Sequence, residues 1–289
     1  MTPQMTADML VARDGTKLPL RHWDADVPDQ GKPRAVIVAL HGMSDYSNAF
    51  AMPAKVWAKQ GITTLAYDQR GFGTGDRPGI WAGADAMRGD LNDAIAAARA
   101  RYPGVPVFAL GESMGGAVLL TALASDSPPA VDGVILVAPA VWSRSDMPLT
   151  YRAALFLAAH LLPGMILSNS AASHVVTITP SDNIEMLRAL SRDPLFQKST
   201  RTDTLFGLVN LMDEARTAPE LIKTAPPILF FYGANDQIIP AKPTQAVIEG
   251  LGAKAKVKRY EHGYHMLLRD LEGEQVDRDI ADWMFSRGD

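Results

Sequence analysis

The stretch Val107-Phe-Ala-Leu-Gly-Glu-Ser-Met-Gly-Gly116 decides how the rest of this sequence is interpreted. Its first four residues are apolar and predict a buried strand, and a run of helix formers, 117–124, follows with almost no loop. The junction Gly111-Glu-Ser-Met-Gly115 matches the pattern G-x-S-x-G of a tight strand-to-helix turn. In such a turn Ser113 takes a strained backbone conformation, and the residues two positions to either side have no room for a Cβ atom.

This turn gives Ser113 the position of a nucleophile. The strain lifts the hydroxyl clear of the sheet edge, and the N-terminus of the following helix offers free N–H groups to a developing negative charge. The alternative is a glycine-rich turn with an incidental serine. A strand before the pattern and a helix after it favour the nucleophile.

Composition narrows the class of protein. The chain has 289 residues, 47% of them apolar, which suits one large α/β domain or a domain with an insertion. The formal net charge of −4 is mild, so a nucleic-acid partner is not expected. Without cysteine there are no disulfides, thiolate metal sites or cysteine nucleophiles. The first residues lack a signal-peptide pattern, so we expect a cytoplasmic location, with peripheral membrane contact as an option.

Strand-like and helix-like segments alternate along most of the sequence. A hairpin around Asp14-Gly15 is followed by six short runs that predict strands, most of them apolar: 35–40, 63–67, 107–110, 134–138, 228–232 and 256–260. The alternation with helices predicts an α/β fold with a mostly parallel, eight-stranded sheet flanked by helices. Region 141–219 shows helical segments and no strong strand. We therefore expect a helical cap, inserted after the sixth strand, over a core of 1–140 and 220–289.

A serine nucleophile needs a base, and six histidines are available. Because the loops after parallel strands meet at one sheet edge, His41, His262 and His265 could all approach Ser113. His265 is preferred, since the loop beyond Gly263 can carry it over the edge, whereas His262 still belongs to the strand end. The others lie on an early strand or in the cap: His22, His160 and His174.

Asp236 is the candidate acid that orients the base. It stands in Gly233-Ala-Asn-Asp-Gln-Ile-Ile-Pro240, directly after a predicted strand, whereas no carboxylate directly follows the strand 134–138. The alternative role is that of a turn-forming residue beside Asn235. With a serine and a histidine already placed, the triad role is favoured.

Two backbone donors are needed for the oxyanion of a tetrahedral intermediate. The N–H of Met114, directly after the nucleophile, is one candidate. The other is the N–H of Met43, because Gly42 lets the loop after the first core strand come close. His41 is interpreted as a hydrogen-bonded support of this loop rather than a base. Carboxylate pairs lack histidines at metal spacing, so neither a metal nor another cofactor is expected.

The predicted cap is unusually apolar, with 153–159, 161–162 and 165–167 as its richest parts. Ordinary helix packing explains some of this surplus. The remaining apolar residues would line a channel for an acyl chain and form a patch that docks on lipid. On this hypothesis the substrate-binding residues are Gly42, His41, Leu155, Leu162 and Ile239.

These motifs together resemble the monoacylglycerol lipase/lysophospholipase group of the α/β-hydrolase superfamily. The matching pieces are His41-Gly-Met43, Asp68-Gln-Arg-Gly-Phe-Gly73, Gly111-Glu-Ser-Met-Gly-Gly116, Gly233-Ala-Asn-Asp-Gln-Ile-Ile-Pro240 and Gly263-Tyr-His-Met266. The resemblance implies the α/β-hydrolase fold, a helical lid, and Ser113, Asp236 and His265 as the triad. It also implies an oxyanion hole from Met43 and Met114.

The expected function is that of a serine esterase on monoacyl lipids, acting through an acyl-enzyme. A small-ester or thioester hydrolase and an acyltransferase are alternatives with the same triad. A non-catalytic ligand-binding protein on the same fold is the alternative from a different class, although such proteins usually lose a triad member. A peptidase is disfavoured because the cap offers no obvious acidic cluster for a free amine.

Overall fold

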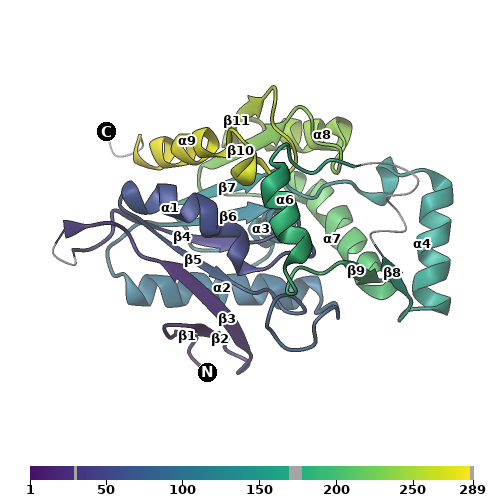
Figure 1. The fold of residues 1–289 in the computed structure, drawn as a ribbon, viewed down its shortest axis with the longest axis horizontal. Coiled ribbons are helices and arrows are strands. Elements are labelled where there is room, and N and C mark those ends of the chain that lie inside the picture. Colours follow the sequence, from purple (N-terminus) through teal and green to yellow (C-terminus); the bar gives the residue numbers. More distant parts are fainter. Residues whose placement is uncertain (29–30, 169–177, 287–289) are drawn as a thin grey trace.

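The centre of the molecule is a twisted sheet (Figure 1). The computed structural model describes residues 1–28, 31–168 and 178–286. These residues form a nine-stranded sheet in the order β1-β2-β3-β5-β4-β6-β7-β10-β11. The strands are β1 (Gln4–Met5), β2 (Met9–Val11), β3 (Lys17–Trp23), β4 (Ala35–Leu40), β5 (Ile62–Tyr67), β6 (Val107–Glu112), β7 (Gly133–Val137), β10 (Ile228–Gly233) and β11 (Ala255–Tyr260).

The sheet confirms the predicted fold class. In the order of the sheet, each pair of neighbours in β5-β4-β6-β7-β10-β11 is parallel. The antiparallel hairpin β2–β3 joins this part of the sheet through β3, which pairs antiparallel with β5. One strand beyond the predicted eight is present. It is the two-residue β1, which pairs with β2 and is too short to leave a pattern in the sequence.

The inserted segment lies between β7 and a long helix, α7 (Thr202–Leu221). It contains α4 (Leu149–Leu161) and α6 (Ile184–Arg192), as expected for a helical cap. The segment also holds two short strands that the sequence did not indicate, because β8 (Ile166–Ser168) pairs antiparallel with β9 (Ser199–Arg201). Each is only three residues long, and the pairing depends on a chain reversal between them rather than on a local pattern.

The end of the inserted segment packs with the core. Helix α7 contacts α3 (Met114–Leu123) and α8 (Ala241–Leu251), and its apolar residues belong to the main core cluster. We therefore propose the start of α7 as the boundary between cap and core, in place of residue 219. His174 lies outside the described residues.

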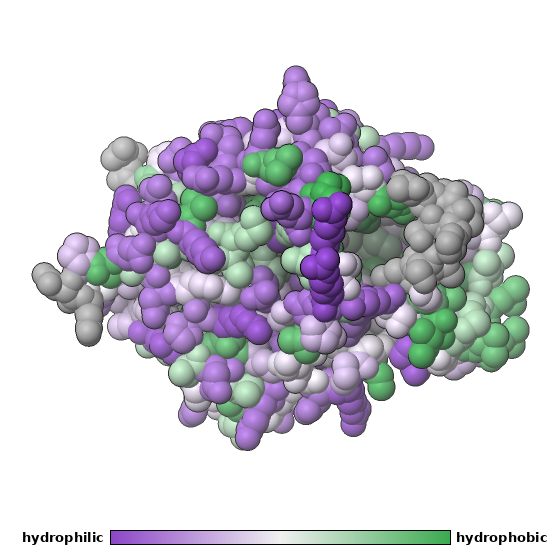
Figure 2. Space-filling view, in the orientation of Figure 1, coloured by the Kyte–Doolittle hydropathy of each residue, from purple (hydrophilic) through white to green (hydrophobic). Residues whose placement is uncertain are grey.

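Helix α4 projects from one end of the molecule. Figure 1 places it at the right, and Figure 2 shows hydrophobic residues gathered at that end. Within the described ranges, none of the helices is both long enough and apolar enough to span a bilayer.

The two faces of the sheet carry separate hydrophobic clusters. In β4, Val36, Val38 and Leu40 belong to one cluster, and the alternating Ala35, Ile37 and Ala39 belong to the other. The first cluster includes residues of α2 (Ala84–Arg101), α3, α7 and α8. The second includes residues of α1 (Ala51–Lys59) and α9 (Gly273–Phe285). Helices on both faces explain why strands such as β4 are apolar throughout.

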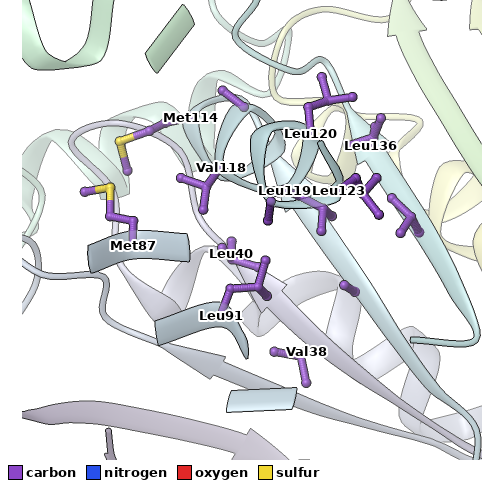
Figure 3. Packing of buried hydrophobic residues seen from close by; sticks show 14 of the residues in the cluster. Val38, Leu40, Met87, Leu91, Met114, Val118, Leu119, Leu120, Leu123 and Leu136 are labelled. Carbon is purple, nitrogen blue, oxygen red and sulfur yellow. The ribbon is translucent and has the colours of Figure 1, made fainter. Parts of the chain in front are cut away.

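Helix α3, which follows the G-x-S-x-G turn, is buried along its whole length. Figure 3 shows Val118 and Leu119 of this helix among Leu40 of β4 and Leu91 of α2. Interiors are close-packed, so a helix enclosed in this way has little freedom to shift. The N-terminus of α3, where Ser113 lies, is therefore held firmly.

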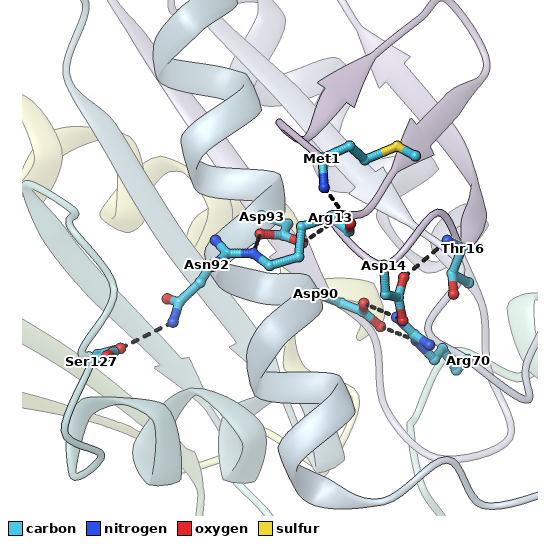
Figure 4. Close-up of polar contacts among 9 residues, drawn as sticks. All are labelled: Met1, Arg13, Asp14, Thr16, Arg70, Asp90, Asn92, Asp93 and Ser127. Atoms are coloured by element: carbon cyan, nitrogen blue, oxygen red, sulfur yellow. Dashed lines mark hydrogen bonds and ion pairs between the residues drawn. The ribbon is translucent and has the colours of Figure 1, made fainter.

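Paired charges join the N-terminal hairpin to α2 (Figure 4). Arg70 Nε donates to Asp90 at 2.7 Å, and Arg70 Nη2 also reaches Asp14 at 2.8 Å. Arg13 Nε donates to Asp93 at 2.7 Å. The two α2 carboxylates are buried and would be unfavourable without these partners.

Candidate active site

Ser113 occupies the strained turn between β6 and α3. Its backbone angles are φ 52° and ψ −114°, a region that side-chain-bearing residues rarely enter. The backbone is held there at both ends of the residue. Its N–H donates to the Val137 carbonyl at 3.0 Å, and its carbonyl accepts from the N–H groups of Ala117 and Ala140. Strain held by surrounding hydrogen bonds is typical of functional sites.

The glycines on either side of Ser113 are required by close contacts. A Cβ atom on Gly115 would lie 2.2 Å from the Leu40 carbonyl oxygen, and one on Gly111 would lie 2.5 Å from the Gly115 carbonyl oxygen. Both neighbours are backbone atoms and cannot move aside. The expectation that neither position has room for a side chain is confirmed.

His265 joins Ser113 to Asp236. Its Nε2 lies 2.9 Å from Ser113 Oγ, and its Nδ1 lies 2.8 Å from Asp236 Oδ2. A carboxylate oxygen accepts from Nδ1–H, which leaves Nε2 free to accept the serine proton. The structure therefore brings together the three predicted residues, whereas His262 is exposed beside its strand end.

Asp236 fulfils both roles that the sequence suggested. Its Oδ1 accepts from the N–H groups of Ile238 and Ile239 at 2.8 and 3.0 Å, which stabilises the turn after β10. Its Oδ2 is left to accept from His265, and the side chain is 0% exposed. The turn thus fixes the carboxylate that orients the imidazole.

The loop after β4 lies against the serine. A Cβ atom on Gly42 would be 3.2 Å from Ser113 Cβ and 3.7 Å from its Oγ. Within the described residues, the N–H groups of Met43 and Met114 donate no hydrogen bond. Two free backbone donors next to a serine hydroxyl are what an oxyanion hole requires.

His41 supports this loop from behind. Its Nδ1 contacts the Gly42 carbonyl at 2.8 Å, and its Nε2 accepts from the N–H of Gln69 at 3.0 Å. Full burial lowers the pKa of His41, so the ring is neutral. With both ring nitrogens engaged, it is a hydrogen-bonded support, as interpreted from the sequence.

A pocket of about 330 Å³ opens at Ser113 and His265. Its apolar wall comes from α6 and the segments on either side of it, and from the loops after β4, β10 and β11. The residues that line it are Gly42, Met43, Ser44, Asp45, Glu112, Ser113, Pro180, Leu187, Leu190, Ser191, Phe196, Ile238, His265, Met266 and Arg269.

Of the five predicted substrate contacts, Gly42 alone is among the described pocket-lining residues. His41 is buried behind Gly42, and Ile239 is buried in the core beside its pocket-lining neighbour Ile238. Leu155 packs against the core cluster, and Leu162 is 56% exposed at the end of α4. These four assignments need correction. Helix α4 carries Leu155 and Leu162 away from the site, which α6 covers instead, and His41 and Ile239 are buried behind neighbours that line the pocket.

Sequence reasoning missed the pocket wall formed by α6. The spacing of Ile184, Leu187 and Leu190 is that of an amphipathic helix and could have indicated an apolar face. It could not have indicated that this face lies over Ser113.

Across the described ranges, no group of three or more histidine, cysteine, aspartate or glutamate side chains is placed to hold a metal ion. The two carboxylates in the pocket wall, Asp45 and Glu112, are each paired with Arg269.

The parallel sheet, the strained serine at its edge and the serine–aspartate–histidine order along the chain define the class of α/β hydrolases. A family model described as "Serine aminopeptidase, S33" matches residues 31–272. The chain belongs to this family.

Several known proteins are similar over nearly the whole chain. Human monoglyceride lipase is 27% identical over 99% of this chain and 92% of its own length. The phospholipase YtpA of Bacillus subtilis is 25% identical over 88% of this chain and 94% of its own. A carboxyl esterase of Bacillus coagulans, crystallised with glycerol, superposes with a TM-score of 0.79 at 19% identity, covering 99% of both chains. In sequence and fold, the chain is a monoacylglycerol lipase-like α/β hydrolase.

Proposed function

We propose that this protein is a serine hydrolase that cleaves the carboxylic ester bond of monoacyl lipids, such as a monoacylglycerol or a lysophospholipid. The observation that carries the proposal is the hydrogen-bonded chain from Ser113 through His265 to Asp236 at the base of an apolar-walled pocket. The similarity to a monoglyceride lipase and to a phospholipase supports the substrate class.

The first half of the reaction forms an acyl-enzyme. His265 Nε2 takes the proton of Ser113 Oγ, which lies 2.9 Å away, as the oxygen attacks the ester carbonyl carbon. Asp236 stabilises the imidazolium through Nδ1–H. His265 then gives the proton to the leaving alcohol as the C–O bond breaks.

The negative charge on the carbonyl oxygen needs stabilisation in this step. The N–H groups of Met43 and Met114 are the proposed donors, and the N-terminal end of α3 adds its dipole. In the second half, His265 takes a proton from the water that attacks the acyl carbon. It returns this proton to Ser113 Oγ as the bond between that oxygen and the acyl carbon breaks and the fatty acid leaves. No metal or organic cofactor takes part in these steps.

The pocket wall supports an acyl ester over an amino-terminal peptide. Leu187, Leu190 and Phe196 give an apolar surface for a hydrocarbon chain. The family description names an aminopeptidase, whose substrate carries a free ammonium group. The pocket carboxylates Asp45 and Glu112 are already occupied by Arg269 and offer such a group no free charge.

We further propose that α4 touches a membrane or micelle surface when the enzyme meets its substrate. Leu149, Tyr151, Phe156, Leu157 and Leu161 are all more than half exposed on this helix. Exposed apolar residues on one projecting helix are typical of interfacial contact. Lipid esters are held in such surfaces, so this contact would bring the pocket to its substrate.

The test is hydrolysis of p-nitrophenyl esters from acetate to palmitate by the wild-type chain and by Ser113→Ala. We expect activity to peak at medium or long acyl chains and to fall by about 10⁴-fold or more in the variant, because the nucleophile is lost. Labelling by a fluorophosphonate, which reacts with activated serines, should also be absent in Ser113→Ala. An aminoacyl p-nitroanilide serves as the peptidase control.

Other outcomes select among the alternatives. Activity confined to acetate would replace the lipase by a small-ester hydrolase. Turnover of an acyl thioester, or transfer of the acyl group to an alcohol in preference to water, would indicate a thioesterase or an acyltransferase. A folded chain that neither labels nor hydrolyses any ester would be a binding protein.

A further inference from the structure

Arg269 forms a buried ion cluster in the wall of the pocket. The side chain lies at the end of a short 3₁₀ turn, Leu267–Arg269, and the residue is 5% exposed. Its Nη1 donates to Asp45 Oδ2 at 2.8 Å, and its Nη2 donates to Glu112 Oε2 at 3.2 Å. Asp45 and Glu112 are each 2% exposed, so all three charges are withdrawn from water.

Each member of this cluster belongs to a different loop of the site. Glu112 directly precedes Ser113 in the strained turn. Asp45 lies two residues after Met43, in the loop after β4. Arg269 lies four residues after His265, in the loop after β11. One planar guanidinium therefore joins the three segments that carry the proposed nucleophile, oxyanion donor and base.

The positive charge of Arg269 also compensates the buried carboxylates next to the site. Burial raises the pKa of Glu112, and the neighbouring Arg269 opposes this rise. Burial would lower the pKa of Arg269, but Asp45 and Glu112 outweigh it and hold the guanidinium charged. Without Arg269, two uncompensated carboxylates would line the pocket that opens at Ser113.

Stability alone does not explain the cluster. Within the described residues, Glu112 Oε1 and Arg269 Nε are buried without a hydrogen-bond partner. A buried ion cluster with unsatisfied atoms is often no more stabilising than apolar side chains of similar volume. Its geometry is more specific, because a guanidinium can hold two carboxylates at fixed angles, which an ammonium on a flexible stem cannot.

We propose that Arg269 is a positioning residue that holds the loops of Ser113, Met43 and His265 in register through its two ion pairs. The proposal rests on the proposed function. It assigns to Arg269 no contact with the reacting atoms, and its effect passes through Glu112 and Asp45.

The experiment compares Arg269→Met and Arg269→Lys with the wild-type chain on p-nitrophenyl butyrate. Active sites are counted by complete fluorophosphonate labelling, so kcat refers to folded, reactive sites. We expect kcat to fall about 100-fold in Arg269→Met and about 10-fold in Arg269→Lys, with KM changed less than about threefold, because a small misplacement of reacting groups is enough for such losses.

Arg278→Met is the matched control. Arg278 forms an exposed ion pair with Glu274 on α9, so its loss should leave kcat and KM unchanged. Labelling by the fluorophosphonate should also be slower in the Arg269 variants and unchanged in this control.

A double variant separates positioning from stability. Arg269→Met leaves two uncompensated carboxylates, and adding Glu112→Gln removes one of them. We expect the melting temperature to recover in part in the double variant, while kcat stays low because the loops are still unlinked. Recovery of kcat together with the melting temperature would overturn the positioning role. If Arg269→Met does not fold, kcat and the melting temperature are compared in the same way for Arg269→Lys and for the single Glu112→Gln variant.

The outcomes distinguish this proposal from the proposed function. An active wild-type chain and an inactive Ser113→Ala variant, with kcat unchanged in Arg269→Met, would overturn the positioning role and leave the hydrolase intact. An inactive wild-type chain, or an active Ser113→Ala variant, would overturn the proposed hydrolase itself.

Discussion

Helices α4 and α6 come from the same inserted segment, but α6 covers the site and α4 is exposed to solvent. Helix α6 lies over the site and presents Leu187 and Leu190 to the pocket. Helix α4 has no buried residue and exposes Leu149 and Leu161 at 73% and 72%. Apolar residues are abundant in both, so composition alone does not separate a pocket wall from a surface.

Polar contacts at the two ends of α6 account for the difference. Before the helix, Asn183 Nδ2 donates to the Arg269 carbonyl at 3.0 Å. After it, Tyr46 Oη donates to Asp193 Oδ2 at 2.7 Å, and the N–H of Gln197 donates to the Ser44 carbonyl at 2.8 Å. These partners belong to the loops of the site itself. Helix α6 is thus held where its apolar face meets Ser113.

Helix α4 rests mainly on α7. Phe156 and His160 contact the ring of Phe206 edge-on, and much of the remaining apolar surface faces outward. Apolar surface that is held over a cavity binds a ligand, and apolar surface that projects from the molecule is available to a larger partner. Three predictions, from the largest expected effect to the smallest, test this division.

The largest effect is expected from Leu190→Asp in α6. A carboxylate placed in the apolar wall is unfavourable beside a hydrocarbon chain, so kcat/KM for the decanoate ester should fall by about 10³-fold. The acetate ester, which is too short to reach this wall, should lose less than about threefold. Initial rates on both p-nitrophenyl esters measure the split.

Ala189→Asp adds the same charge one residue earlier, on the exposed side of α6, and should change neither rate. Equal losses on the two esters in Leu190→Asp would contradict the assignment of α6 as the acyl wall.

The second prediction concerns Asp270, which joins the segment before α6 to the loop of His265. It accepts from Ser181 Oγ at 2.6 Å and from the N–H of Tyr264 at 2.7 Å. Burial raises the pKa of Asp270 from 3.8 to about 6. Between these values the unfolded chain releases the proton and the folded chain keeps it, so this group makes folding less favourable as pH rises.

Asp270→Asn removes this titration. Relative to the wild-type chain, the unfolding free energy of the variant should therefore increase by about 3 kcal/mol from about pH 3 to about pH 7 and then stay level. Urea unfolding at a series of pH values measures the difference. Glu272→Gln, at an exposed neighbour, is the control. A difference that does not depend on pH would show that Asp270 titrates normally in the folded protein.

The smallest effect is expected from Leu157→Ser combined with Leu161→Ser in α4. Removing two exposed leucines should weaken partition onto phosphatidylcholine vesicles by about tenfold, since less apolar area is withdrawn from water. Hydrolysis of monomeric p-nitrophenyl butyrate should not change. Sedimentation with vesicles measures binding, and Ala153→Ser with Ala154→Ser is the control on the same helix. Undiminished vesicle binding would exclude α4 as the contact surface.

The site framework could be predicted from the sequence because it depends on local and topological rules. The spacing of Gly111, Ser113 and Gly115 admits one kind of turn, since larger residues collide with backbone atoms. Asp236 and His265 follow strand ends, and the carboxyl ends of parallel strands meet at one edge. These rules act within a few residues or follow from strand order, so no side-chain packing had to be known.

The pocket wall and the Arg269 cluster were decided by tertiary structure alone. An amphipathic pattern shows that α6 has an apolar face, but tethers from residues far along the chain, such as Tyr46, set where that face points. Arg269 lies 157 residues from Glu112 and 224 from Asp45, and only the packed loops bring the three together. The sequence by itself therefore determined the fold and the candidate reacting groups. The folded chain decided which surfaces surround them, because contacts between distant segments depend on how the whole molecule packs.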